Sequence, residues 1–161
     1  MKILVFSDSH GRTDLMESIT QRHSQEIFAV CFLGDVLRDC AKLQAAFPNL
    51  DIYAVPGNCD PGSRLEPVQI VELGGAKILL THGHLHGVKR GYGMITAYAA
   101  EIGVDACFFG HSHVPIVFEN NGITFLNPGS ITQPRGSMGK SYALVEIAEG
   151  KVLPTLLDAL G

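Results

Sequence analysis

The sequence predicts an α/β protein: a four-layer α/β/β/α sandwich of two packed mixed sheets with helices outside. Two features of the chain predict this fold. The first third alternates strand-like apolar runs with helical stretches, whereas the second half holds mostly short strand-like runs separated by Gly and Pro. A length of 161 residues, 46% of them hydrophobic and 17% charged, fits one globular domain over residues 1–161 and excludes a disordered chain.

The first half is expected to form a βαβαβ unit. Strands are expected at residues 2–6, 28–33 and 51–55, and helices at 13–24 and 39–47. Thr13 resembles the N-cap of the first helix. Because strands joined through helices run in the same direction, this half predicts a parallel sheet.

The second half is expected to supply the second sheet, with mostly antiparallel strands. Runs at 68–73 and 77–81 flank Gly74-Gly75, a strong turn signal that predicts a hairpin. A helix at 94–102 follows, and further strands are expected at 106–109, 115–118, 123–126, 142–147 and 151–156.

Composition excludes several classes of protein. No apolar run approaches the roughly 20 residues that span a bilayer, and the N-terminus lacks a signal-peptide pattern, so we expect a cytoplasmic protein without a membrane segment. A formal charge of -4 without a basic run disfavours tight nucleic-acid binding. The four cysteines form no CxxC pair, which favours reduced thiols over a disulfide framework or a thiolate zinc site.

Metal-capable side chains follow nearly every strand-like run. They lie in Asp8-Ser9-His10, Gly34-Asp35, Gly57-Asn58-Cys59-Asp60, Thr81-His82-Gly83-His84 and Gly110-His111-Ser112-His113. Because the loops at the carboxyl ends of strands form the ligand site of open α/β sheets, we expect these side chains to converge on one edge.

The side-chain types predict a site for divalent metal. The candidate ligands are carboxylate, amide and imidazole groups: Asp8, His10, Asp35, Asn58, His82, His111 and His113. One shared carboxylate would give each of two ions four protein ligands. Such donors suit manganese, the expected ion, with nickel, iron and zinc as alternatives. Two ions with open positions are the usual arrangement for in-line displacement at phosphorus.

The ordered motifs resemble those of the calcineurin-like metallophosphoesterase superfamily, whose pattern is D-x-H, G-D, G-N-H-D/E, H and G-H-x-H. Asn127-Pro128-Gly129-Ser130 resembles its branch of small phosphodiesterases, which includes the small subunit of retromer. The resemblance implies one ion held by Asp8, His10, Asp35 and His113, and another by Asp35, Asn58, His82 and His111. Asp35 then bridges the two ions.

The chain departs from this pattern at Cys59, where the superfamily usually has the histidine implicated in protonating the leaving group. A thiol is a poor general acid at neutral pH. We therefore expect a preference for esters such as aryl diesters, whose leaving group departs without protonation. Asp60 and His84 are the candidate replacements, and the expected catalytic group is Asn58, Cys59, Asp60 and His84.

Several other residues have simpler interpretations. His84 and His86 also fit structural roles beside the ligands, His23 fits an exposed position, and Arg12 and Arg38 fit solvated charges. Cys31 and Cys107 are expected in the core and Cys40 on the inner face of a helix, while Ser130 is expected to shape a loop beneath the site.

The resulting hypothesis is a dinuclear phosphodiesterase in which a metal-bridging hydroxide attacks a small phosphodiester. Two alternatives remain open. One is a non-catalytic interaction scaffold like the retromer subunit, since fold does not determine function. The other is a phosphomonoesterase with the same site. A homo-oligomer is compatible with the sequence.

Overall fold

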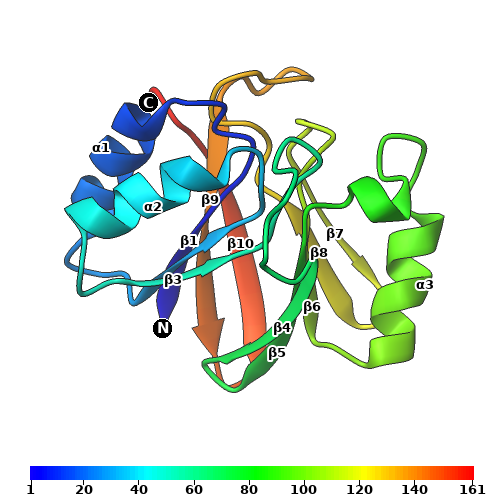
Figure 1. Cartoon of the computed structure of the whole chain (residues 1–161). Helices are drawn as coiled ribbons and strands as arrows, with labels where there is room; N and C mark the ends of the chain where they lie inside the picture. Colours follow the sequence, from blue (N-terminus) through cyan, green and yellow to red (C-terminus); the bar gives the residue numbers. More distant parts are fainter.

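The computed structural model describes residues 1–161, and its ten strands form two five-stranded sheets packed on each other (Figure 1). Helices α1 and α2 cover the outer face of one sheet, and α3 covers the outer face of the other. The predicted four-layer sandwich of mixed sheets is therefore confirmed.

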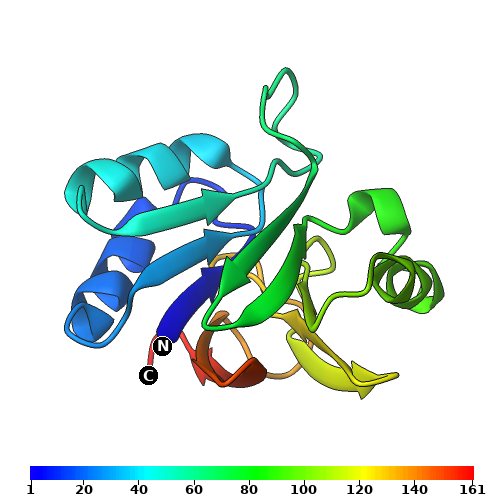
Figure 2. The same ribbon diagram turned by 90° about the horizontal axis from the view of Figure 1, so that it is seen from below.

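The first half forms the predicted βαβαβ unit: β1 (Lys2–Phe6), α1 (Thr13–His23), β2 (Ala29–Phe32), α2 (Leu37–Ala46) and β3 (Asp51–Ala54). The three strands are parallel, with Leu4 beside Val30 and Val30 beside Ile52. Their arrows point the same way in Figure 2, so the loops after them share one edge of the sheet.

The second half is divided between the two sheets, which corrects the expectation that it supplies one sheet alone. Strands β9 (Ser141–Ala148) and β10 (Lys151–Asp158) join the first sheet, whose order is β10-β9-β1-β2-β3. Strand β9 pairs antiparallel with β1. The pairing is required because β1 is buried on both faces and β2 satisfies only one of its edges.

The second sheet has the order β4-β5-β6-β8-β7. It contains β4 (Val68–Leu73), β5 (Ala76–Thr81), β6 (Ala106–Phe108), β7 (Ile116–Asn120) and β8 (Ile123–Asn127). The β4-β5 and β7-β8 pairs are antiparallel, whereas β6 runs parallel to both its neighbours. Gly74 and Gly75 form the predicted hairpin turn with positive φ angles of 57° and 81°.

The main core lies between the sheets. In β1, Ile3 and Val5 enter this core, whereas Leu4 and Phe6 face the helices. Such alternation follows from the two-residue period of a strand, and burial on both faces explains why the run carries no polar residue between Ile3 and Phe6. The strand thereby delivers the polar residues after Phe6 to the sheet edge in a fixed orientation.

Two helical details differ from the sequence-based expectation. Thr13 is the first residue of α1 and not its N-cap; its hydroxyl donates to Asp39 in α2 instead. A short 3-10 helix, η1 (His84–His86), precedes α3 (Gly93–Ile102) and was not predicted. None of the helices has the length and apolar character needed to cross a membrane.

Candidate metal centre

The predicted ligands converge where the two sheets meet. Asp8 and His10 follow β1, Asp35 follows β2, Asn58 follows β3, His82 follows β5, and His111 and His113 follow β6. Within each sheet these loops are joined by backbone hydrogen bonds, such as Asp8 N–H to the Gly34 carbonyl at 3.0 Å and Gly110 N–H to the His82 carbonyl at 2.9 Å. Between the sheets, the His111 N–H donates to Asp8 Oδ2 at 3.1 Å. Loops from both sheets therefore form one site.

The ligand loops adopt an uncommon backbone conformation. Seven non-glycine residues have positive φ, and five of them are predicted ligands: Asp8, His10, Asp35, His111 and His113. The other two are hairpin residues that precede Gly122 and Gly150. Left-handed backbone costs a non-glycine residue roughly 1–2 kcal/mol, and such conformations concentrate at functional sites. Here they turn the side chains inward.

Asp8 lies at the centre of the cluster. Its Oδ1 is 3.1 Å from His113 Nε2, 3.8 Å from His82 Nε2 and 4.0 Å from His10 Nε2. Both Asp8 Oδ1 and His10 Nε2 are buried without a hydrogen-bond partner. Buried polar atoms are rarely left unsatisfied, so an orphaned carboxylate oxygen beside imidazole nitrogens fits a cation.

The tautomers of two histidines also fit a cation. His82 Nδ1 lies 2.5 Å from the Leu33 carbonyl, and His113 Nδ1 lies 2.7 Å from the Gln133 carbonyl. A carbonyl only accepts, so each Nδ1 carries the hydrogen, which leaves the Nε2 lone pair of a neutral ring free to bind metal. His82 Nε2 faces Asn58 Oδ1 at 3.1 Å. A cation between these two acceptors satisfies both.

Asp35 is the second carboxylate of the centre. Its Oδ2 lies 3.4 Å from His82 Nε2 and 4.0 Å from His10 Nε2, while its Oδ1 accepts the Cys59 N–H at 2.9 Å. Burial alone raises the pKa of Asp35, but the hydrogen bond and charge of His82 outweigh it and lower the pKa overall. For His82, burial lowers the pKa, and Asp35 and Asp8 raise it overall.

His111 completes the candidate ligands from the second sheet. Its ring centroid lies 5.0 Å from that of His82. Burial, reinforced by the charges of His82 and Lys89, lowers the pKa of His111 to about 4. The ring is therefore neutral near pH 7, which is the form that binds metal.

The closest donor atoms form two groups that meet at Asp8. In each group the donors lie within 4.8 Å of one another: Asp8, His10 and His113 in one, and Asp8, Asp35 and His82 in the other. Asp35 was expected to be the shared residue, whereas the residue common to these two groups is Asp8. Asn58 and His111 lie beside the second group, through their contacts with His82.

The structure gives different surroundings to the predicted catalytic residues. Cys59 is exposed. The partial burial of its thiol raises the pKa, and the charge of Asp35 raises it further. Asp60 accepts the backbone N–H groups of Asp35 at 2.9 Å, Leu37 at 2.8 Å and Gly57 at 2.9 Å. Three donors on one carboxylate favour a role in bracing the loops over proton donation.

His84 lies beside the ligands, whereas His86 does not. The His84 ring centroid is 5.4 Å from that of His82 and 6.0 Å from that of His111. Burial lowers the pKa of His84, and the charge of His82 lowers it further. His86 instead packs on Tyr98 at 4.7 Å, which is the structural role expected for it.

The loop after β8 braces the centre from beneath. Ser130 Oγ donates to the Asp8 carbonyl at 2.9 Å and accepts the Gln133 N–H at 2.8 Å, so it connects the backbones of Asp8 and of the residue that orients His113. The expectation that Ser130 shapes this loop is confirmed. Asn127 Nδ2 donates to the Gly110 carbonyl at 3.0 Å and extends the brace to β6.

Sequence reasoning missed Asp39. This fully buried carboxylate accepts hydrogen bonds from Ser9 Oγ at 2.6 Å, Gly11 N–H at 2.7 Å and Thr13 Oγ1 at 3.1 Å. It holds the loop that carries His10 against α2. No local pattern separates Asp39 from an ordinary acidic residue near a helix N-terminus.

The remaining sequence-based interpretations have mixed outcomes. Cys31 and Cys107 are buried, and Arg12 forms an exposed ion pair with Asp14 at 2.9 Å, as expected. His23 was expected to be simply exposed, which is wrong. It lies 2.6 Å from Glu26 Oε1 and 3.0 Å from the Tyr142 hydroxyl, because it joins α1 to β9.

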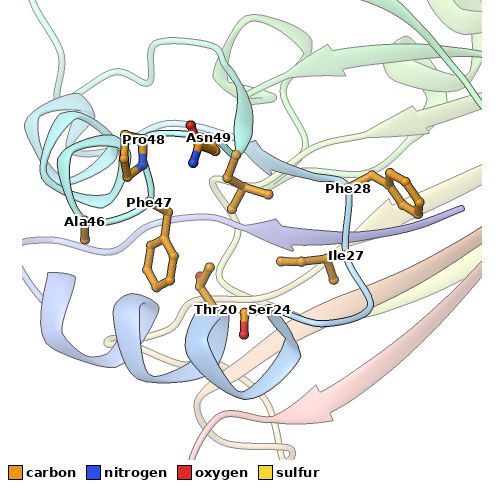
Figure 3. A pocket seen from close by; sticks show the side chains of 9 residues that line it. Thr20, Ser24, Ile27, Phe28, Ala46, Phe47, Pro48 and Asn49 are labelled. Carbon is orange, nitrogen blue, oxygen red and sulfur yellow. The ribbon is translucent and has the colours of Figure 1, made fainter.

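A separate cavity of about 410 Å³ lies at the other end of the first sheet (Figure 3). Its lining comes from the C-terminal parts of α1 and α2 and from residues that precede β2 and β3, including Thr20, Ile27 and Phe47. None of the predicted site residues lines it. The cavity is thus distinct from the metal centre.

Comparison with known proteins decides the family. The pattern of the calcineurin-like phosphoesterase superfamily domain matches residues 1–150. The chain belongs to this superfamily. A probable metallophosphoesterase of Bacillus subtilis, YsnB, is 35% identical over 100% of this chain and 93% of its own. The phosphodiesterase YfcE of Escherichia coli is 28% identical over 91% of this chain and 88% of its own.

A solved structure and a further relative extend the comparison. The calcineurin-like domain superposes on a Streptococcus pneumoniae protein described as a predicted phosphoesterase, with a TM-score of 0.84 and 35% identity over 98% of this chain and 89% of the other. The vacuolar protein sorting-associated protein 29 of Schizosaccharomyces pombe is 33% identical over 82% of this chain and 73% of its own. With the ligand cluster, these relatives support a metal-dependent phosphoesterase.

Proposed function

We propose that the protein is a phosphodiesterase that holds two divalent ions, with manganese the expected metal. The observation that carries this proposal is the orphaned Asp8 Oδ1, which lies buried among three imidazoles and belongs to both groups of donor atoms. The name of YfcE, a phosphodiesterase 28% identical to this chain, supports the diester specificity.

The proposed ligand sets use every predicted metal residue. Asp8, His10, Asp35 and His113 would hold one ion, and Asp35, Asn58, His82 and His111 the other. When bound, the ions would supply Lewis-acid stabilisation of charge on the phosphoryl oxygens and activation of water. The chain's own contribution is orientation: the Leu33 and Gln133 carbonyls fix the rings of His82 and His113 so that each Nε2 faces the carboxylates.

The proton donors beside the centre favour a good leaving group. Cys59 presents an exposed thiol, a weaker acid than an imidazolium, and Asp60 is occupied by three backbone donors. His84, an imidazole near the proposed ligands, remains as the candidate proton donor. The aryloxide of an aryl diester leaves without protonation, so aryl diesters are the proposed model substrates.

Hydrolysis of bis(4-nitrophenyl) phosphate, compared with 4-nitrophenyl phosphate, tests the proposal. With Mn²⁺ we expect diester cleavage that EDTA abolishes and that Asp35→Asn lowers by more than about 100-fold, because a ligand carboxylate is lost. Asp51→Asn, an exposed change at the start of β3, is the matched control and should retain full activity. Diester cleavage that persists in Asp35→Asn would contradict the proposal.

Two competing functions give different outcomes in the same assay. Faster cleavage of the monoester than of the diester would indicate a phosphomonoesterase. No cleavage with any divalent ion would favour an interaction scaffold, the reading supported by the similarity to vacuolar protein sorting-associated protein 29.

A further inference from the structure

We propose that Ser7 is a positioning residue that commits Asp8 to bind metal through Oδ1 alone. The inference rests on the proposed metal-dependent function, and it assigns a role to a residue outside the ligand motifs. Ser7 follows β1 directly and is fully buried.

The Ser7 hydroxyl has one acceptor among the side chains of the centre. Its Oγ donates to Asp8 Oδ2 at 2.5 Å, and the His111 N–H donates to the same oxygen at 3.1 Å. One donor comes from the end of β1 and the other from the loop after β6, so the two sheets hold Asp8 Oδ2 between them. Two donors satisfy this oxygen.

Gly110 makes room for this contact. A Cβ at residue 110 would lie 2.0 Å from Ser7 Oγ and 2.9 Å from Asp8 Oδ2. The loop after β6 therefore approaches Ser7 and Asp8 so closely that only glycine fits, and Gly110 encloses the hydroxyl and Asp8 Oδ2 from one side. The enclosure keeps the donor directed at Oδ2.

The consequence is a carboxylate with two unequal oxygens. Oδ2 carries both donors, whereas Oδ1 carries none and faces His10, His82 and His113. Rotation of the carboxylate about its Cβ–Cγ bond would break both hydrogen bonds. Ser7 thus holds Oδ1, the oxygen shared by the two donor groups, in place, and it disfavours chelation of one ion by both oxygens.

Ser9 provides a matched control on the other side of Asp8. It is also fully buried, and its hydroxyl also donates to a buried carboxylate, but that carboxylate is Asp39, which is not a proposed ligand. Ser7→Ala and Ser9→Ala therefore each remove one buried hydroxyl and one hydrogen bond to an acid from the same loop. Only Ser7→Ala removes a donor from the carboxylate of a proposed ligand; the other contact of Ser9 Oγ is the backbone carbonyl of Asp35, at 3.5 Å.

Calorimetric titration of the metal-free protein with Mn²⁺ tests the role of Ser7. Ser7→Ala should weaken binding about 10- to 100-fold, the range observed when a partner of a metal ligand is lost. Ser9→Ala should weaken it far less, because Gly11 and Thr13 still hold Asp39 against the loop. The visible absorption of the Co²⁺-loaded protein should change in Ser7→Ala, because a freed Asp8 alters the coordination number. A role limited to folding would leave that spectrum unchanged.

Three outcomes separate the explanations. Wild-type affinity and an unchanged Co²⁺ spectrum in Ser7→Ala would overturn the inference, and so would equal weakening in Ser9→Ala. A wild-type protein that binds no Mn²⁺ would instead overturn the proposed function itself. Should Ser7→Ala fail to fold by circular dichroism, Ser7→Gly replaces it, since it also removes the hydroxyl that donates to Asp8 Oδ2; wild-type affinity there would contradict the proposal.

Discussion

Asp60 supports Asp35 through the backbone: Asp60 Oδ2 accepts the Asp35 N–H at 2.9 Å. The same carboxylate accepts N–H groups from Leu37 and Gly57, so it fastens the loop after β2 to the loop after β3. Asp35 Oδ1 in turn accepts the Cys59 N–H. The two loops therefore exchange hydrogen bonds, and the position of one proposed ligand depends on an acid outside the proposed ligand sets.

Replacing Asp60 with Asn should destabilise the fold. One acceptor oxygen becomes an amide that faces a backbone N–H, so we expect a loss of about 1–3 kcal/mol in the free energy of unfolding. Urea denaturation measures it. Glu66→Gln, an exposed change in the segment that follows, is the control and should unfold like the wild type. An unchanged urea midpoint for Asp60→Asn would show that the replaced oxygen contributes nothing to stability.

Metal removal should lower the melting temperature. The donors lie far apart along the unfolded chain, so an ion binds the native state and stabilises it by about 2.7 kcal/mol at 100 times its dissociation constant. A thermal scan with Mn²⁺ and with EDTA measures the shift. The shift should be smaller in His113→Ala, because this variant lacks a proposed ligand whose Nε2 lies 3.1 Å from Asp8 Oδ1. No shift in the wild type would count against a metal centre.

Restoring a histidine at residue 59 should broaden the leaving groups that the enzyme accepts. Proton donation by a placed side chain contributes about 10²–10⁴-fold, so Cys59→His should raise hydrolysis of alkyl esters by a factor in this range. Aryl diesters should gain little. The ratio of the two kcat/KM values is the measurement, and Cys59→Ala controls for loss of the thiol. An unchanged ratio would mean that residue 59 does not reach the leaving group.

Alkylation should single out Cys59 and should accelerate with pH. Cys59 is the exposed cysteine, whereas burial raises the pKa of Cys31 to about 12. The thiolate is the reactive form, and a raised pKa keeps Cys59 protonated at neutral pH, so the rate should climb as the pH rises through that pKa. Iodoacetamide labelling followed by mass spectrometry measures it. Labelling of Cys31 at a similar rate would contradict the packing of the core.

The sequence predicts the fold class and the convergence of polar residues at the strand ends, but it does not predict every long-range pairing. Proposed ligands such as Asp8 and His82 lie within two residues of the ends of apolar strands, and the geometry of parallel strands brings such residues together. Positions that depend on distant pairing leave no local signal. The placement of β9 beside β1 is one case, and the buried hydrogen bonds of Asp39 are another. The bracing residue Ser130 was visible only through its Pro-Gly turn.

The place of β1 in its sheet has a consequence for the order in which the centre is completed during synthesis. All seven proposed ligands lie within residues 8–113, so a ribosome has made them well before it reaches β9. Yet β1, which carries Asp8 at its end, lies between β2 and β9, and Ser130 binds the Asp8 carbonyl. A nascent chain that already holds every proposed donor thus lacks the strand and the loop that fix the first of them, and metal capture awaits synthesis of Ser130 and β9.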